Sequence, residues 1–226
     1  MLNTSTLLIV IALLLARRAS KVFALLVSAL FGYLIGGFPS AALLARLNGK
    51  SIFTIGSGNM GAMNTVRNVG VVKGVLVLLA DIGKGSLATF LGMKLASLNG
   101  ATDLWLLAIP LVAGATAVVG HGWSPYIGLK GGKGLSTTLG VGLPLYPIPA
   151  LFGLITLITI ILVLRRVNLA STITISIYPL IVLLVLIYAG ETSRVAITIF
   201  CGVLLLGIIG LIKHMPSLQT HEPTLF

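Results

Sequence analysis

The stretch "GSGNMGAMNTVRNVG", residues 56–70, gathers polar groups that could act together on an anion. It combines several glycines with the hydroxyl of Ser57, the amides of Asn59 and Asn64 and the guanidinium of Arg67. A glycine-rich loop can turn its backbone N–H groups toward a ligand, and the side-chain amides and guanidinium add strong hydrogen bonds. The composition favours an anion site, and a plain turn between two apolar segments is the alternative.

A second polar stretch, "GHGWSPYIGLKGGKGLSTTLG", places two lysines three residues apart around a glycine pair. Lysine supplies a point charge, glycine allows close backbone approach, and the helix expected next would direct its N-terminal N–H groups at a phosphate. The spacing is not that of a Walker phosphate loop. We expect phosphate to be held here, with an ordinary turn as the alternative, by Lys130, Gly131, Gly132, Lys133 and Gly134.

Two shorter clusters and one histidine complete the candidate groups. "LRRVNLASTIT" contains Ser171, which could bind a ligand or cap a helix. "LIKHM" contains His214, which could bind a ligand or complement the dipole at a helix C-terminus. The paired arginines before Ser171 suit lipid headgroups as well as a ligand. His121 could orient the second loop or donate a proton.

The segment "DIGKG" differs because it lies inside an apolar run. Asp81 and Lys84 are three residues apart, so they are neighbours on one helical face. A charge at bilayer depth costs about 2.5 to 3.5 kcal/mol on insertion scales, which makes such a pair either a buried structural pair or part of a functional site.

Composition places the whole chain in a membrane. Only 8% of its 226 residues are charged, and 57% are hydrophobic. The net charge of +11 comes from cations that lie between apolar segments, which is typical of topology signals and not of a nucleic-acid-binding face. The sequence has no H-E-x-x-H motif, no Cys/His metal spacing and no G-x-S-x-G elbow, so we expect no metal and no cofactor.

The apolar segments predict an all-α, polytopic membrane helix bundle of about seven transmembrane helices. A spanning helix needs about 20 largely apolar residues. Glycines at helix contacts suit such a bundle, and none of these segments alternates apolar with polar residues as a β-barrel strand does. The fourth segment is short, and the expected spans are Val22–Leu47, Gly70–Leu98, Leu104–Gly120, Leu135–Tyr146, Ile148–Leu164, Ser171–Ala189 and Val195–Ile212.

Counting these spans from outside gathers the polar stretches and most cations on one face. By the positive-inside rule, that face is cytoplasmic in a multi-pass cell-membrane protein. A further segment, Thr6–Ala16, is too short to span, and we expect it to form a short extra N-terminal helix. The positive charges of "RRASK" that follow it would then lie outside, contrary to the rule.

The chain resembles the bacterial membrane acyltransferases that pass a fatty acyl group from acyl phosphate to the 1-hydroxyl of glycerol 3-phosphate. The motifs that carry the resemblance are "GYLIGGFPSA", "GSGNMGAMNTVRNVG", "DIGKG", "GHGWSPYIGLKGGKG" and "RRVNLAS", in this order. The resemblance implies lysophosphatidate and inorganic phosphate as products, in phospholipid synthesis. It also implies seven spans, motifs at the cytoplasmic side, and neither a metal nor an acyl-enzyme.

The resemblance assigns roles to residues of this chain. It implies catalytic roles for Ser57, Arg67, Lys133, Ser171 and His214. It implies phosphate binding by Asn59 and Asn64, and we extend that role to Lys130, Gly131, Gly132 and Gly134, with Asp81, Lys84 and His121 in support. The expected partners are acyl phosphate, glycerol 3-phosphate and membrane lipid, with no nucleic acid.

The ends of the chain depart from the family pattern. Asn168 stands where the family usually has serine, and Pro216 should break any helix in the tail "HMPSLQTHEPTLF". We divide the chain into an N-terminal extension (1–21), a membrane acyltransferase-like domain (22–214) and a divergent tail (215–226). Two alternatives remain: a small-anion transporter, suggested by the Asp81–Lys84 pair and the short fourth span, and a catalytically inactive paralogue.

Overall fold

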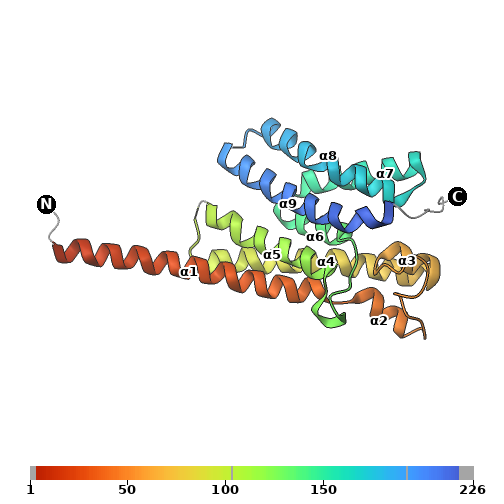
Figure 1. Ribbon diagram of the computed structural model, residues 1–226. Helices are drawn as coiled ribbons and strands as arrows, with labels where there is room; N and C mark the ends of the chain where they lie inside the picture. The colour runs from red at the N-terminus through yellow and green to blue at the C-terminus, as the bar shows by residue number, and fades with distance from the viewer. Residues whose placement is uncertain (1–3, 103, 192, 219–226) are drawn as a thin grey trace.

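The computed structural model describes residues 4–102, 104–191 and 193–218, and within these residues the chain forms helices and no strands (Figure 1). Most of the helices lie roughly parallel or antiparallel along one axis, as in a membrane bundle. In chain order, the helices are α1 (Thr4–Gly37), α2 (Ser40–Arg46), α3 (Ala62–Asn68), α4 (Val71–Leu98), α5 (Leu104–Gly122), the 3₁₀ turn η1 (Pro125–Ile127), α6 (Leu135–Leu145), α7 (Pro147–Leu164), α8 (Val167–Tyr188) and α9 (Ser193–Leu218).

The predicted membrane helix bundle is confirmed, with six long apolar helices and, at the fourth expected span, a shorter one. Among the described residues, the segments long and apolar enough to cross a membrane contain α1, α4, α5, α7, α8 and α9. The fourth expected span is α6, whose 11 residues cover about 16 Å, roughly half of a bilayer core. Pro144 lies inside α6 and Pro147 begins α7, so the chain turns back after this short helix.

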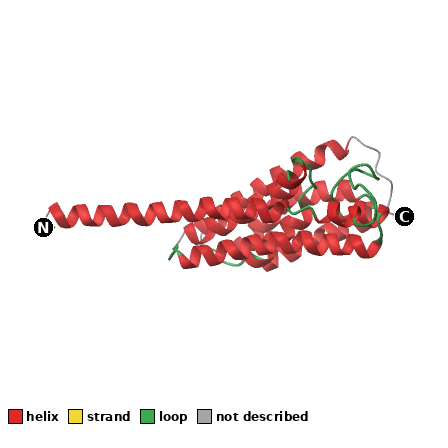
Figure 2. Cartoon of the chain, turned by 90° about the horizontal axis from the view of Figure 1, so that it is seen from below, coloured by secondary structure: helices red, strands yellow, loops and turns green. Residues whose placement is uncertain are grey.

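The N-terminal region differs from the expectation. The expected separate helix over residues 6–16 is the first part of α1, which continues unbroken to Gly37 and extends beyond the bundle (Figure 2). The "RRASK" segment contains no glycine or proline, and arginine, alanine and lysine are good helix formers, so nothing interrupts the helix there. The first expected span also ends earlier, because Pro39 separates α1 from the short helix α2.

The last helix extends beyond its expected end. Pro216 was expected to break the helix, and α9 continues to Leu218, with residues 219–226 of the predicted tail outside the described part of the chain. A proline near a helix C-terminus removes one backbone hydrogen bond from the last turns and leaves the long apolar part of the helix intact. The position of His214 is therefore helical.

Glycines allow the first and fifth helices to approach closely. A Cβ on Gly36 would overlap the backbone of Ala117, and a Cβ on Gly120 would overlap the carbonyl of Tyr33. In a membrane, no hydrophobic effect drives helices together. Small residues allow the close van der Waals contact that holds the helices against each other. α4 packs against this pair, and α6 packs against α4.

The bundle collects its polar connections at one end. The segments between α1 and α4, between α5 and α6, and between α7 and α8 all lie toward the end where α9 finishes (Figure 1). The α4–α5 and α8–α9 connections lie at the other end of the bundle. The two long polar stretches of the sequence are thus on the same face, as the count of apolar segments predicts.

The close approach at Gly36 generates a stability prediction. We expect Gly36→Ala to lower the stability of the folded protein by about 1 to 3 kcal/mol, because the added methyl forces α1 and α5 apart. Gly83→Ala is the matched control: its Cβ meets no atom within 4 Å, and alanine favours the helix. Thermal unfolding in detergent compares them, and equal melting temperatures for the two variants would contradict this account of the α1–α5 contact.

Candidate functional site

Asn64 organises the first polar loop. Its Oδ1 accepts a hydrogen bond from the backbone N–H of Ser57 (3.1 Å) and from Nδ2 of Asn68 (2.9 Å). Its Nδ2 donates to the carbonyls of Asn59 (3.0 Å) and Ile55 (3.2 Å). The side chain is buried, and both of its polar atoms are used by the loop. Asn64 therefore shapes the loop from within.

The same loop leaves other polar groups toward its surface. Gly56 has φ +55°, and a Cβ there would collide with the amides of Asn64 and Asn68, so only glycine fits. The side chains of Ser57 and Arg67 are exposed, while Asn59 is partly buried and its backbone N–H lies 3.4 Å from the Ser57 hydroxyl oxygen. The stretch thus presents the Ser57 hydroxyl from its loop part and the Arg67 guanidinium from α3, which forms its second half.

The glycine pair of the second loop lies against the end of α5. The N–H of Gly132 donates to the carbonyl of His121 (3.0 Å), and a Cβ on Gly131 would overlap that carbonyl. A Cβ on Gly132 would overlap Nε2 of His121 and approach the carbonyl of Met60 to 2.7 Å. Met60 belongs to the first loop, so the structure brings the two polar loops into direct contact.

Cations of the second loop connect to its neighbours. Lys130 places its Nζ 5.5 Å from the centre of the Phe53 ring, on the first loop side. Lys133 donates from Nζ to Oδ1 of Asn168 at the start of α8 (2.6 Å). Gly134, with φ +83°, precedes the first turn of α6. Lys133 therefore lies where the loop, α6 and α8 meet.

The remaining candidates lie on α8 and α9. Ser171 is buried one turn after Asn168, on the same face of α8. His214 is buried on α9, with Nδ1 2.9 Å from the carbonyl oxygen of Gly210. The neighbouring Lys213 places its Nζ 4.2 Å from the centre of the Trp123 ring, which connects α9 with the end of α5. Asn168 is the contact that sequence reasoning missed as a site residue, although its spacing from Ser171 indicates the shared face.

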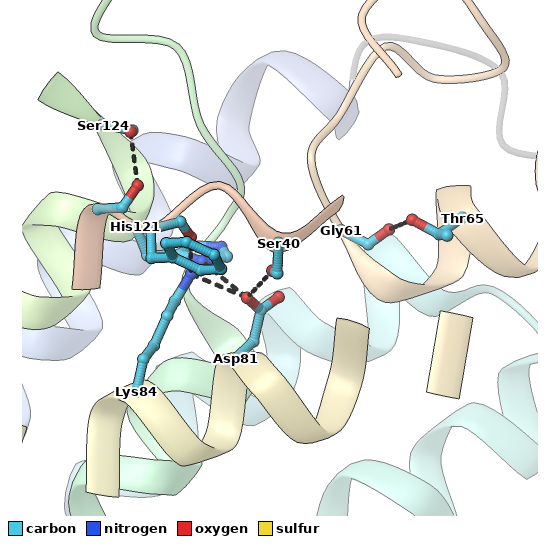
Figure 3. Close-up of polar contacts among 9 residues, drawn as sticks. Ser40, Gly61, Thr65, Asp81, Lys84, His121 and Ser124 are labelled. Carbon is cyan, nitrogen blue, oxygen red and sulfur yellow. Dashed lines mark hydrogen bonds and ion pairs between the residues drawn. The ribbon is translucent and has the colours of Figure 1, made fainter. Parts of the chain in front are cut away.

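Asp81 and Lys84 form a buried cluster behind these loops (Figure 3). Oδ1 of Asp81 accepts hydrogen bonds from the Ser40 hydroxyl (2.8 Å) and from Nζ of Lys84 (2.8 Å). Nδ1 of His121 lies 3.6 Å from the same oxygen. His121 therefore has Asp81 on one side of its ring and the second loop, through Gly132, on the other. The cluster connects α4, α5 and the start of α2.

The cluster also closes the C-terminal end of α1. The last carbonyls of a helix have no partner within it. Here Lys84 donates to the carbonyl of Phe38 (3.2 Å), and Ser124 donates to that of Gly37 (2.6 Å). Tyr126 donates to the carbonyl of Leu34 (3.1 Å). Sequence reasoning missed Ser40, which donates to Asp81, and Ser124, which donates to the last carbonyl of α1. These contacts fix the point where the chain leaves α1 for the first loop.

An apolar groove of about 120 Å³ begins at Lys133. It runs between α6, α7, α8 and α9, and most of its lining is aliphatic, with Leu139, Leu154 and Leu206 among the contributors. Thr174 of α8 and Gly210 of α9 line it near its cationic end, and Tyr178 lines it farther along α8. Asp81 and Lys84 do not line it.

The fold and the site together define a class of protein. This is a multi-pass membrane protein in which cationic, glycine-rich loops meet an apolar groove at a single lysine. Such a junction can hold a molecule that joins a phosphate to a long apolar chain, with the phosphate among N–H groups and cations and the chain between helices.

Comparison with known proteins identifies the family. The family model for glycerol-3-phosphate acyltransferase matches residues 26–221. The glycerol-3-phosphate acyltransferase of Geobacter sulfurreducens is 34% identical over 187 residues, which cover 83% of this chain and 88% of that protein. Glycerol-3-phosphate acyltransferase 1 of Dehalococcoides mccartyi is 38% identical over 190 residues, covering 81% and 85%. The chain belongs to the glycerol-3-phosphate acyltransferase family.

Solved structures agree with this assignment. The crystal structure of an integral membrane glycerol 3-phosphate acyltransferase, PlsY (YgiH), in its glycerol 3-phosphate form superposes with a TM-score of 0.72 at 31% identity. The alignment covers 86% of this chain and 90% of that one. The lysophosphatidic acid form of the same enzyme gives a TM-score of 0.70 at 30% identity. The resemblance read from the motifs is confirmed.

The buried cluster generates a stability prediction. We expect Asp81→Asn to destabilise the protein by about 3 to 5 kcal/mol, because it leaves the charge of Lys84 buried without its carboxylate. Combining Asp81→Asn with Lys84→Met removes both charges and should recover much of the loss, although Phe38 then lacks its donor. Thermal unfolding of the two variants measures this. A single variant as stable as the original protein would refute the role of the pair.

Proposed function

We infer that this protein transfers a fatty acyl group from acyl phosphate to the 1-hydroxyl of glycerol 3-phosphate, giving lysophosphatidate and inorganic phosphate. The observation that carries the inference is the position of Lys133, which lies in the polar loop and at the beginning of the apolar groove. Both substrates carry a phosphate, and the donor also carries a long chain. Family membership and the substrate and product named for the structural neighbour support the same reaction.

The two polar loops supply the anion-binding groups. Ser57 is exposed on the first loop and Arg67 on α3 directly after it, and Lys130 and Lys133 belong to the second loop. The glycines between these lysines pack against the end of α5 and Met60, and the N-terminus of α6 follows directly, where its N–H groups could meet a phosphate. The contact between the loops at Met60 and Gly132 brings both sets of groups to one place, where two phosphates would be held close together.

The reaction needs positioning and charge stabilisation more than a nucleophile on the protein. The glycerol hydroxyl oxygen attacks the acyl carbon, the bond from that carbon to the phosphate oxygen breaks, and the phosphate leaves with the hydroxyl proton. Because the leaving group is itself an anion, Arg67 and Lys133 would stabilise the charge that develops on it. Ser171 and His214, buried at the same end of α8 and α9, would hold the substrates in register.

The groove provides room for the acyl chain. A chain attached to a phosphate beside Lys133 would enter between α6, α7, α8 and α9, among aliphatic side chains. The Asp81–Lys84 pair, on which a transport function would depend, lies outside this groove and holds the end of α1. The arrangement therefore favours acyl transfer over transport.

The cation-rich loop end would face the cytoplasm. Arg46, Lys50 and Arg67 lie between α1 and α4, and Arg165 and Arg166 lie between α7 and α8, all toward this end of the bundle. By the positive-inside rule, such a bias places the loops in the cytoplasm. Glycerol 3-phosphate, the soluble substrate, would then reach the site from the cytoplasm.

The choice of donor tests the function. Purified protein supplied with glycerol 3-phosphate should form lysophosphatidate from palmitoyl phosphate, also in the presence of a chelator, and not from palmitoyl-coenzyme A. A thioester donor generally requires a general base poised at the acceptor hydroxyl, whereas acyl phosphate is already activated. Mass spectrometry of the lipid product measures the outcome. Turnover of the thioester, or loss of activity on chelation, would refute this mechanism.

The guanidinium of Arg67 provides a second test. Arg67→Lys keeps the charge and loses the planar fork, so we expect kcat/KM to fall roughly ten- to a hundredfold, as for the loss of one hydrogen bond to a charged group. The matched control is Arg46→Lys, on an exposed arginine of α2 outside both loops, which should leave the kinetics unchanged. Equal kcat/KM values for the two variants would contradict a role of Arg67 in binding the substrate phosphate.

A further inference from the structure

Tyr178 separates the apolar groove from a second, smaller cavity. The second cavity has a volume of about 30 Å³ and is lined by α5, α6, α7, α8 and α9. The two spaces have Thr138, Tyr178, Val203 and Leu206 in common, so these side chains form the partition between them. Tyr178 is the largest of the four.

The second cavity continues the line of the groove away from Lys133. Along α8, the groove is lined by Thr174 and Tyr178, and the second cavity by Tyr178 and Val182. Along α9, the lining passes from Gly210 through Val203 to Ile199 in the same direction. With a rise of 1.5 Å per residue, Tyr178 lies about 15 Å along α8 from Asn168, and Val182 about 6 Å farther.

A glycine on α7 makes room for the tyrosine ring, and a glycine on α6 lies beside the tyrosine hydroxyl. A Cβ on Gly153 of α7 would lie 2.5 Å from Cε2 of the Tyr178 ring, and one on Gly142 of α6 would lie 3.8 Å from its hydroxyl oxygen. The ring therefore extends from α8 past α7 toward α6. Because it fills the space between these helices, the ring closes the groove, and its hydroxyl is not needed for this.

We propose that Tyr178 is the end wall of the acyl groove and sets the longest acyl chain that the enzyme accepts. The proposal rests on the proposed function, because it takes the acyl chain of the donor as the occupant of the groove. A chain anchored by its phosphate at Lys133 extends along α8 and stops at the ring. Tyr178 thus acts as a specificity-determining residue, remote from the reacting atoms.

The test measures chain-length preference in the full-length protein. Lauroyl, myristoyl, palmitoyl, stearoyl and arachidoyl phosphates are supplied together with glycerol 3-phosphate, and the lysophosphatidate species are quantified by mass spectrometry. The original protein should show a length above which kcat/KM falls. Tyr178→Ala, and the less disruptive Tyr178→Leu, should raise kcat/KM for the next longer donor about tenfold relative to the donor preferred before, since forcing methylenes against a closed wall is costly.

Matched variants distinguish the loss of the Tyr178 ring from the loss of its hydroxyl and from a general disturbance of α8. Tyr178→Phe keeps the ring and should keep the length limit. Leu180→Ala changes a side chain of α8 that is 57% exposed and lines neither cavity, and it should alter neither the limit nor the activity. Adding Val182→Phe to Tyr178→Ala refills the second cavity and should restore the original limit.

The outcomes distinguish this proposal from the function on which it depends. If the original protein uses none of the acyl phosphates, the proposed function fails before the wall is tested. If the protein is active and both Tyr178→Ala and Tyr178→Leu keep the original limit, the chain leaves the groove sideways and Tyr178 is not its end wall. A limit that moves with Leu180→Ala as much as with Tyr178→Ala would also overturn the proposal.

Discussion

Asp81 is a carboxylate buried among helices, so its charge has to be neutralised where it lies. Ser40 and Lys84 bind the same oxygen, and His121 lies beside it. Ser40 begins α2 and His121 lies at the end of α5, while Lys84, on α4 itself, also donates to the carbonyl of Phe38 just after α1. Satisfying one buried charge therefore fixes these three points relative to α4. The second polar loop follows the end of α5 directly and the first follows α2, so the positions of both depend on this cluster.

The conformation of each loop is held by residues that pack or hydrogen-bond within the protein. Asn64 uses its whole amide to fold the first loop, and the glycine pair of the second loop is required by the backbone of α5 and by Met60. This division of labour explains why the motifs contain more residues than a phosphate could contact. Ser57 and Arg67 are exposed and Lys133 lines the apolar groove, so in the proposed reaction these are the groups that would meet the substrates.

Sequence reasoning identified the motifs, their common end of the bundle and the membrane class, because apolar length and charge are properties of local segments. It predicted helix boundaries less well, because these depend also on contacts between residues far apart in the chain. The break expected near residue 17 is absent because helix formers bridge it, whereas α6 is a short helix that turns back at its prolines. Which partners the Asn64 amide has could not be read from the sequence either: it hydrogen-bonds within its own loop, and phosphate binding by Asn64 stays a prediction.

By itself, the sequence determined that the chain is a membrane helix bundle, which end of the bundle is polar and which family the motifs resemble, since each follows from composition and spacing along the chain. Tertiary structure alone decided that Asp81 and Lys84 hold a helix end, that Lys133 reaches Asn168 and that Tyr178 separates two cavities. These contacts join residues from different helices, and helix packing, through close approaches such as Gly36 on Ala117, sets which of them meet.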